Sequence, residues 1–465
     1  MLSIHPLPYP PPSRGRERVG GLYAAKKEIN MRYIIIGGSA AAISAIEAIR
    51  SIDHESPIDL FSDESTPLFS RVLLPYYIAE ELSKPLLNFR SADFFEQTRV
   101  TPHLGVRVRK ISIDSKTVQT KNGDAHPFDK LLLATGGNPI IPSIQGIDKE
   151  GISTLKTMAD AERIYNLKGK KAVVIGAGSV GVESCISLKR RGMEVTLLEQ
   201  LGHVLPTVFD EEAASIVRKR IENLGIKTIT GEKALQFTGN GHVKSVVTDS
   251  REIESDIVVV AVGVRPAIEL AQTTGIEIGS LGGIKVNGRM MTGAQDIYAA
   301  GDVTETYDIT RDTNWINAIW PCAVEQGRIA GLNMAGRETP YEGSFRRNSI
   351  GNFIGVPAIS MGLTQAETCS SCEGGEAFQE IKRRTKDTYK KLILKNGRLV
   401  GTILVGQTQK AGLFYVLLKK KIDVSDYTSI LMSRDLNFMS ILPLIRKNAD
   451  RFTETEYKEI MDTML

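Results

Sequence analysis

Hydrophobic and polar positions along the chain fall twice into the same order. Residues 32–50, RYIIIGGSAAAISAIEAIR, begin with an apolar run, break at two glycines and continue with small residues at helical spacing. Residues 170–200, KKAVVIGAGSVGVESCISLKRRGMEVTLLEQ, repeat this order and then add another apolar run. Each segment predicts a strand, a tight turn and a helix, and the second also predicts the strand that follows.

The turn in each segment is compared with the pattern G-x-G-x-x-G. In that pattern the first glycine allows the tight turn, the second lets backbone approach a dinucleotide pyrophosphate, and the third lets the helix pack on the strand. The second segment carries the pattern in full, at Gly176, Gly178 and Gly181. The first segment reads Gly37, Gly38, Ser39, Ala40, Ala41, Ala42. One such pattern is a weak signal, but two inside strand-helix-strand contexts strongly predict two dinucleotide sites.

Three further apolar segments end in small residues: FDKLLLATGGNP at 128–139, DIVVVAVGVRP at 256–266 and TGAQDIYAAGDV at 292–303. We expect the first two to be matching strands that end near Gly136 and Gly263. This order, with the second nucleotide unit inserted into the first, resembles the pyridine nucleotide-disulfide oxidoreductases, which are flavoproteins with two dinucleotide-binding domains. The resemblance covers residues 31–336 and rests on five motifs in the right order.

The resemblance implies an α/β fold with two Rossmann-like domains, the NAD domain inserted in the FAD domain, and a C-terminal α+β interface domain. The segment YKKLILKNGRLVGTILVG also predicts a hairpin turning at Asn396-Gly397. The first thirty residues are rich in Pro, Gly and Arg and lack the apolar core of a signal peptide. The expected parts are a disordered or non-native extension at 1–30, an FAD domain at 31–146 and 264–342, an NAD domain at 147–263, an interface domain at 343–421 and a helical tail at 422–465.

The first glycine segment is the expected site of flavin adenine dinucleotide (FAD). Serine and alanine are the smallest side chains after glycine, so Ser39 and Ala42 can replace the missing glycines with little crowding. In the segment PIDLFSDES, Ser62 stands where an acid usually binds the adenosine ribose. Because serine is not an acid, we choose the next residue, Asp63, with Glu64 beside it. The resemblance adds Asp302 for the ribityl chain and a helix within 317–331 whose N-terminus points to the flavin. The remaining expected FAD residues are Gly37, Gly38, Arg71, Ala134, Thr135, Gly136 and Gly301.

The second segment is the expected site of NAD(H). Glu199 closes its last strand, where a carboxylate accepts hydrogen bonds from a ribose 2′-hydroxyl and repels a 2′-phosphate. NADH is therefore the preferred nucleotide. Glu183 resembles the family glutamate near the nicotinamide, and the alternative is a charge on the helix surface. The other expected NAD residues are Gly176, Gly178, Gly181 and Gly263.

The chain lacks the thiol chemistry of many relatives. Residues 67–82, PLFSRVLLPYYIAEEL, contain no cysteine, and the resemblance puts Val72 where single-cysteine relatives carry theirs. No histidine follows His242, so a C-terminal His-Glu acid-base pair is excluded. The chain thus resembles a cysteine-free branch that includes rubredoxin reductases and the flavin domains of NADH-nitrite reductases. The resemblance implies that the flavin itself carries the reaction. Arg71, Glu183 and Cys322 are candidate catalytic residues, and the alternative role of Arg71 is a surface ion pair.

The cysteine content and the length of the apolar runs predict where in the cell the protein is found. The chain has only four cysteines and six histidines, so we do not expect a fold held together by disulfides, and we expect a cytoplasmic location. Cys185 is predicted to lie in the core, and Cys322 to pack or to lie near the flavin edge. Cys369 and Cys372 form CSSC in a polar turn, and two cysteines alone do not make a metal site. No apolar run reaches the roughly 18 residues of a membrane span.

The distribution of charged residues along the chain indicates what kind of protein partner to expect. The net charge of +4 is too small to indicate nucleic acid, yet residues 343–465 hold 19 Lys and Arg against 13 Asp and Glu. The runs Lys382-Arg383-Arg384 and Lys419-Lys420-Lys421 would suit an acidic iron-sulfur or rubredoxin-type carrier, or they are a solvated face. We expect an enzyme, as a homodimer or part of a complex, that passes electrons between NAD(H) and such a carrier. The alternatives are a flavin NADH oxidase that uses oxygen and a non-catalytic FAD-containing sensing or assembly subunit.

Overall fold

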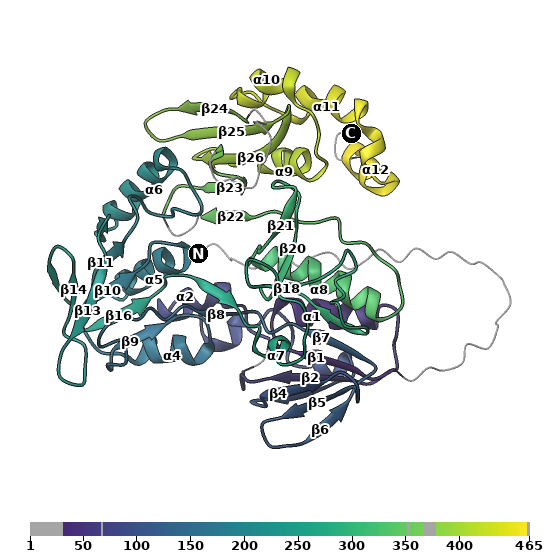
Figure 1. Cartoon of the computed structure of the whole chain (residues 1–465). Coiled ribbons are helices and arrows are strands. Elements are labelled where there is room, and N and C mark those ends of the chain that lie inside the picture. The colour runs from purple at the N-terminus through teal and green to yellow at the C-terminus, as the bar shows by residue number, and fades with distance from the viewer. Residues whose placement is uncertain (1–30, 67, 351–353, 367–377, 463–465) are drawn as a thin grey trace. The chain divides into compact units, whose positions relative to one another are not determined.

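A computed structural model of the 465-residue chain describes residues 31–66, 68–350, 354–366 and 378–462. The chain divides into two units, residues 1–30 and 31–465, and the second unit contains all the described residues (Figure 1). The extension predicted at residues 1–30 lies outside the described residues and stays a prediction.

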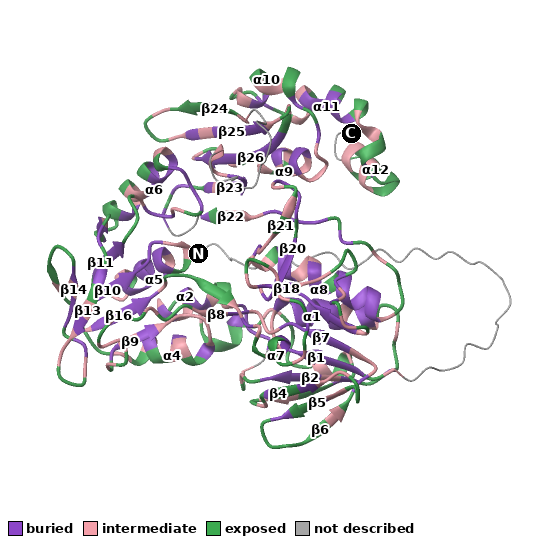
Figure 2. Cartoon of the chain, viewed as in Figure 1, coloured by how far each residue is buried: buried purple, intermediate pink, exposed green. Residues whose placement is uncertain are grey.

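The first sheet is parallel and has the order β19-β7-β1-β2-β3. Its strands are β1 (Tyr33–Ile36), β2 (Ile58–Ser62), β3 (Val100–Leu104), β7 (Lys130–Leu133) and β19 (Ile297–Ala299). All four residues of β1 are buried, as expected for a parallel strand covered on both faces (Figure 2). The predicted strand, turn and helix at residues 32–50 are therefore confirmed, because α1 (Ala40–Arg50) follows β1 after a short turn.

The second sheet is also parallel and has the order β12-β11-β10-β16-β9. Its strands are β9 (Ile152–Thr154), β10 (Lys171–Ile175), β11 (Glu194–Glu199), β12 (Lys227–Thr230) and β16 (Ile257–Val260). The helices of this region are α4 (Met158–Asn166), α5 (Ser179–Arg190) and α6 (Glu211–Asn223). Residues 170–200 therefore form the predicted strand, helix and strand.

The chain crosses from the first sheet to the second and returns. Strand β19 joins the first sheet although it follows the whole second sheet in sequence. At the crossing, β8 (Gly137–Pro139) pairs antiparallel with β17 (Val264–Pro266). The two apolar segments form the predicted strands β7 and β16, but the predicted ends at Gly136 and Gly263 are wrong, because β7 ends at Leu133 and β16 at Val260. A short break follows each of them, and the chain then turns into this two-stranded ribbon.

Helix α1 lies against α8 (Trp320–Met334), which confirms the helix predicted within 317–331. A Cβ atom on Gly327 would lie 2.1 Å from the Ala41 carbonyl oxygen, and one on Gly331 would lie 2.4 Å from the Ala45 oxygen. The two helices therefore approach so closely that only glycine fits on α8. This packing fixes the helix after the first glycine turn.

A third sheet is antiparallel and has the order β22-β23-β26-β25-β24. Its strands are β22 (Arg347–Ile350), β23 (Ala358–Gly362), β24 (Phe378–Arg384), β25 (Tyr389–Lys395) and β26 (Arg398–Val405). The hairpin predicted at Asn396-Gly397 is confirmed, since Lys395 pairs with Arg398 and both turn residues have positive φ.

The end of the chain is helical, as predicted. The third sheet and these helices share one apolar cluster that includes Leu392, Phe414 and Ile445. The helices are α9 (Ala411–Lys419), α10 (Thr428–Met432), α11 (Phe438–Lys447) and α12 (Glu454–Asp462). Among the described residues, no helix is long and apolar enough to cross a membrane.

Shorter elements complete the described chain. Two antiparallel ribbons, β4-β5-β6 and β13-β14-β15, are each associated with one of the parallel sheets, and β18-β20-β21 follows the crossing. These strands are β4 (Val108–Ser112), β5 (Thr117–Thr120), β6 (Ala125–Pro127), β13 (Ala234–Thr238), β14 (Ser245–Thr248), β15 (Glu252–Glu254), β18 (Ile284–Lys285), β20 (Thr304–Asp308) and β21 (Thr313–Trp315). The short helices are η1 (Arg71–Leu73), α2 (Leu74–Ile78), η2 (Lys84–Leu87), α3 (Phe94–Gln97), α7 (Glu269–Gln272), η4 (Ser425–Tyr427) and η5 (Ala449–Arg451).

Candidate functional site

The first glycine turn follows β1 directly. Gly37 has a φ of +118°, and a Cβ there would lie 2.1 Å from the Ala134 carbonyl oxygen at the end of β7. Only glycine fits this position, because both the backbone angle and the neighbouring strand exclude a side chain. Ser39 is the N-cap residue that precedes α1, and Ala42 is fully buried in the helix. An alanine is therefore accommodated where the third glycine of the pattern would stand.

The carboxylates after β2 differ in their surroundings. Ile36 pairs with Phe61, so Ser62 is the residue at the strand end, as the sequence alignment of strands predicted. Asp63, our choice from the sequence, is exposed, whereas the Glu64 side chain is only 19% exposed. Glu64 Oε2 is buried and has no hydrogen-bond partner among the described residues. This geometry favours Glu64 as the acceptor for a ribose hydroxyl.

Glu64 belongs to a cluster of two acids and two bases. Arg71 in η1 donates through Nη2 to Glu64 Oε1 and through Nη1 to the carbonyl of Lys156, at 2.8 Å. Burial and the Arg71 charge lower the pKa of Lys156, while Glu64 and Asp302 oppose this shift. Sequence reasoning missed Lys156, whose only signal was a lysine between a short strand and a helix. The ion pair proposed as an alternative role for Arg71 exists, but it lies at this cluster.

Asp302 stands at the end of the turn that follows β19. Burial raises the pKa of Asp302, and the positive charges of Arg71 and Lys156 oppose that rise. Gly301 N–H donates to Gln326 Oε1 of α8 at 2.8 Å, which ties this turn to the helix. Asp302, Glu64, Arg71 and Lys156, which are far apart in sequence, therefore lie within electrostatic range of one another.

The second glycine turn follows β10. A Cβ on Gly181 would lie 1.8 Å from the Gly176 carbonyl oxygen, whereas a Cβ on Gly178 would meet nothing within 4 Å. Gly181 thus lets α5 pack on the turn, and Gly178 leaves backbone accessible to a ligand. These are two of the roles that the pattern predicts.

Glu199 ends β11, where only 6% of its surface is exposed. Its Oε2 accepts from Ala177 N–H of the glycine turn at 2.7 Å, and its Oε1 accepts from Leu201 N–H at 2.9 Å. Each oxygen keeps a second lone pair for another donor. The carboxylate predicted to bind the ribose is therefore held in place by a hydrogen bond from the second glycine turn. The sequence did not predict this bond.

Glu183 lies on α5, two residues beyond Gly181. Its side chain is half-buried, and burial alone raises its pKa to about 7. This burial argues against an ordinary surface charge, because a solvated glutamate keeps a pKa near its usual value, and the role of Glu183 near the nicotinamide stays a prediction.

The residues at the crossing connect the two nucleotide regions. Thr135 Oγ1 donates to the Ala267 carbonyl at 2.8 Å, and Ala267 N–H donates to the Gly136 carbonyl at 2.9 Å. Gly263 has a φ of +120° and accepts a hydrogen bond from Ile140 N–H. These residues hold the two strands of the crossing together.

Comparison with known proteins decides the family. Residues 31–327 match the description "Pyridine nucleotide-disulphide oxidoreductase", a stretch that is more than half of the chain. The chain belongs to the pyridine nucleotide-disulphide oxidoreductase family. Residues 349–422 also match "Rubredoxin NAD+ reductase C-terminal domain". The resemblance stated from the sequence motifs is therefore confirmed.

Relatives of this oxidoreductase family cover most of the chain. A protein described as "NADH-dependent phenylglyoxylate dehydrogenase subunit epsilon", from Aromatoleum evansii, is 31% identical over 87% of this chain and 95% of its own. An "NADH oxidase" from Methanocaldococcus jannaschii is 33% identical over 67% of this chain and 71% of its own. The structure of an NAD-dependent persulfide reductase from A. fulgidus, 27% identical, covers 92% of this chain and 86% of its own with a TM-score of 0.81.

Members of this family bind FAD and NAD(H), and the residues present fit both groups. The fit to FAD rests on the unpartnered buried oxygen of Glu64 and on the half-buried Asp302. The fit to NAD(H) rests on the open Gly178 backbone and on the fixed carboxylate of Glu199. The chain is accordingly an NAD(H)-dependent flavin oxidoreductase.

The described cysteines are unsuited to the thiol chemistry of other family members. Cys185 and Cys322 are both fully buried and free, which confirms the prediction that Cys185 lies in the core. Burial raises the pKa of Cys322 to about 11, so its thiol stays protonated at neutral pH. Its Sγ lies 3.8 Å from the Phe345 carbonyl oxygen, a packed position. Cys369 and Cys372 lie outside the described residues.

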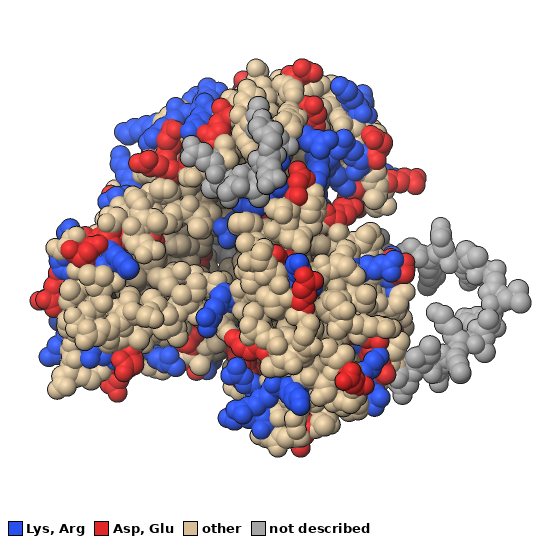
Figure 3. Space-filling view, viewed as in Figure 1, with Lys and Arg blue, Asp and Glu red and all other residues tan. Residues whose placement is uncertain are grey.

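The basic runs are not the free patch that the sequence suggested. Five of the six cations have carboxylate partners, and Figure 3 shows Lys and Arg side chains interspersed with Asp and Glu. The pairs are Lys382 with Glu212 and Glu380, Arg384 with Glu212, Lys419 with Glu325, Lys420 with Glu456, and Lys421 with Asp312. Three of these acids, Glu212, Asp312 and Glu325, lie outside residues 343–465, so they offset part of the excess positive charge counted there.

Proposed function

We propose that this oxidoreductase passes electrons between NAD(H) and a separate iron-sulfur or rubredoxin-type protein, without a redox-active disulfide. The observation that carries the proposal is the state of the described thiols. Cys185 and Cys322 are fully buried, and the raised pKa of Cys322 keeps its thiol protonated. Val72, which the motif resemblance puts where single-cysteine relatives carry theirs, is 51% exposed. An exposed valine at that position offers no thiolate to relay electrons.

The C-terminal region supports a protein partner. Residues 349–422 match a domain named for rubredoxin reductase, and the relative from Aromatoleum evansii is by its name one subunit of a larger dehydrogenase. Either context supplies a redox protein beside the flavin enzyme. We therefore place this chain in a complex or in transient contact with such a carrier.

The residues of the two sites position the cofactors. Glu64 and Asp302 would bind hydroxyl groups of FAD, with Arg71 and Lys156 balancing their charge. Glu199 would accept from the ribose of NADH and disfavour the extra phosphate of NADPH. Bound flavin supplies the chemistry that joins a two-electron donor to a one-electron acceptor.

A flavin NADH oxidase that uses oxygen is the second candidate. It is favoured by one observation, the 33% identity with a protein described as an NADH oxidase. The two candidates differ in what accepts electrons after NADH has reduced the enzyme, so the acceptor decides between them.

The test measures the two half-reactions separately. The FAD-loaded full chain is mixed anaerobically with NADH, and bleaching of the flavin absorbance is followed by stopped flow. The reduced enzyme is then mixed with an oxidised rubredoxin, with a two-iron ferredoxin or with air-saturated buffer. We expect at least one carrier to be reduced more than about tenfold faster than oxygen.

A control addresses the cysteines that the structure does not describe. The double variant Cys369→Ser/Cys372→Ser should keep the rates of both half-reactions. Oxygen as the fastest acceptor would replace the proposal with the oxidase. Loss of carrier reduction in the double variant would show that thiols take part.

A further inference from the structure

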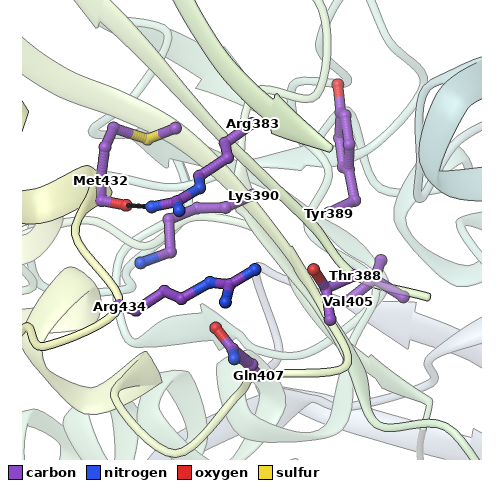
Figure 4. A pocket seen from close by; sticks show the side chains of 8 residues that line it. All are labelled: Arg383, Thr388, Tyr389, Lys390, Val405, Gln407, Met432 and Arg434. Carbon is purple, nitrogen blue, oxygen red and sulfur yellow. Dashed lines mark hydrogen bonds between the residues drawn. The ribbon is translucent and has the colours of Figure 1, made fainter. Parts of the chain in front are cut away.

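The third sheet contains a small basic hollow that none of the predicted site residues lines. It opens where β24 and β25 meet the end of α10. Figure 4 shows its side chains, with those of Arg383, Lys390 and Arg434 close together. The lining residues are Arg383, Thr388, Tyr389, Lys390, Val405, Gln407, Met432 and Arg434. Not one of these eight is an acid.

The two strand cations face each other on neighbouring strands. Arg383 of β24 lies directly opposite Lys390 of β25 in the register of the pair. Like charges opposite one another on neighbouring strands destabilise a sheet. Burial and the Arg383 charge together lower the pKa of Lys390. An anion between the two side chains would relieve both effects.

Part of the charge is balanced by backbone at the end of α10. Lys390 Nζ donates to the carbonyls of Leu431 at 3.1 Å and Ser433 at 3.0 Å, and Arg383 Nη1 donates to that of Met432 at 3.4 Å. Carbonyls at a helix C-terminus are natural partners for cations. These bonds fix the position of the two strand cations but use only three of their N–H groups.

The remaining donors have no carboxylate partner in the part of the chain that the structure describes. Among the described residues, Arg383, Lys390 and Arg434 make no ion pair, and neither Arg434 nor the Gln407 amide makes a hydrogen bond. Asp387, the acid next to the lining residue Thr388, is engaged with Arg220 at 3.1 Å. Two guanidinium groups, an ammonium and an amide therefore line one hollow with unused N–H groups.

We propose that this hollow binds a phosphate group, either as inorganic phosphate or as the phosphoryl end of a small metabolite. Guanidinium forks match the oxygens of a tetrahedral oxyanion in pairs, and three cations suit a dianion better than a single carboxylate. The hollow itself has room for little more than one or two water molecules, so a phosphoryl group would bind at its mouth and a whole nucleotide would not enter it. The ligand would link the β24-β25 edge to the segment between α10 and α11.

The experiment is calorimetric titration of the FAD-loaded full chain with inorganic phosphate at constant ionic strength. Saturating NAD+ is present so that the nucleotide site is occupied. Glycerol 3-phosphate and AMP are titrated separately, because tighter binding of either one identifies a phosphorylated metabolite and tighter binding of phosphate identifies the free ion. Binding should also raise the melting temperature with ligand concentration.

Arg434→Gln is the decisive variant. Arg434 is exposed and supports no other described group, so its loss leaves the fold intact. We expect the Kd for the best of the three ligands to rise about tenfold or more, because one charge-assisted fork is lost. Lys390→Gln should have at least the same effect, with some loss of stability from the two carbonyls that it leaves.

Arg384→Gln is the matched control. It is the next residue to Arg383, but it is on the other face of β24, where it pairs with Glu212 at 3.7 Å. Its Kd should equal that of the unmodified protein. Absence of binding by all three ligands, or an equal loss in Arg384→Gln and Arg434→Gln, would overturn the proposal.

Discussion

The turns after β1 and β10 begin alike and then diverge. A Cβ on Gly37 would meet the Ala134 oxygen at 2.1 Å, and one on Gly176 would meet the Ala261 oxygen at 2.5 Å, so both turns press on the next strand of their sheet. Five residues later the first turn has a fully buried alanine, Ala42, where the second has Gly181. The first glycine of the pattern is thus fixed by the sheet, while the third depends on how closely each helix approaches its turn.

The strand ends opposite these turns diverge further. Ile36 pairs with Phe61 and Ile175 with Leu198, so Ser62 and Glu199 are equivalent positions. Glu199 supports its own turn through Ala177 N–H, whereas Ser62 Oγ accepts from Glu64 N–H at 3.2 Å. The acid that the geometry favours for the first site, Glu64, lies two residues further along the chain. The two sites therefore present a carboxylate from different backbone positions.

The largest effect is expected at the third position of the pattern. Gly181→Ala puts a methyl group 1.8 Å from the Gly176 oxygen, so α5 must move at a cost of about 3 kcal/mol or more. NADH should then fail to reduce the flavin at concentrations that saturate the unmodified protein, while the FAD content per chain stays unchanged. Anaerobic reduction and the absorbance ratio of flavin to protein measure the two quantities.

Ala42→Gly is the matched change in the first turn. It adds no atoms and costs about 0.5–1 kcal/mol through helix propensity, so both FAD content and NADH reduction should survive. Equal damage by the two variants would show that the turns are held to their helices in the same way.

Glu199→Ser should have the next largest effect. It leaves Ala177 N–H and Leu201 N–H without their acceptor and removes the charge that disfavours a 2′-phosphate. The charged hydrogen bond that Glu199 would make to the ribose 2′-hydroxyl of NADH is worth about 1.5–3 kcal/mol. Without it, the ratio of NADH to NADPH reduction rates should fall by about tenfold or more. Ser62→Ala, at the equivalent position of the first site, should leave that ratio unchanged. A preference for NADH that survives Glu199→Ser would move the discrimination to another residue.

Sequence patterns predicted the parts of the fold that depend on residues close together in sequence. The apolar run before Gly37, the complete pattern at Gly176 and the Asn396-Gly397 turn each depend on neighbours in sequence, and all three were confirmed. The strand ends at Gly136 and Gly263 were predicted wrongly, because β8 and β17 are defined by pairing with each other across the chain.

The candidate site residues also divide into those placed by local sequence and those whose surroundings come from distant segments. Glu199 was predicted to end a strand at a set spacing from the glycine turn, and the structure confirms that position, while its role toward NAD(H) stays a prediction. Lys156 was missed, because its surroundings come from Glu64, Arg71 and Asp302, which are distant in sequence. The partners of the basic runs were missed for the same reason, since Glu212 and Asp312 belong to other parts of the chain.

Glu64 and Asp63 give a smaller effect that sharpens the contrast between the two sites. Glu64→Gln removes the negative charge that pairs with Arg71 and converts an acceptor oxygen to a donor, so the Kd for FAD should rise about tenfold. Asp63→Asn changes an exposed residue and should alter the free energy of FAD binding by less than about 0.5 kcal/mol. Fluorescence of released flavin on dilution measures both. A larger effect of Asp63→Asn would restore the choice made from the sequence.

The smallest effect concerns one more pair of equivalent positions, Ser44 on α1 and Glu183 on α5. Ser44 Oγ donates to the Val324 carbonyl of α8 at 2.8 Å, whereas burial raises the pKa of Glu183 to about 7. A carboxyl whose pKa is higher in the folded than in the unfolded chain favours folding when it is protonated. Its stabilising effect is therefore lost as pH rises from the unfolded value, about 4.3, through the folded value. The difference in melting temperature between Glu183→Gln and the unmodified FAD-loaded protein should accordingly grow in favour of the variant between pH 5 and pH 8, all other groups being common to both. Ser44→Ala should show a constant difference over the same range, and a constant difference for Glu183→Gln would mean that Glu183 is ionised in the folded protein throughout.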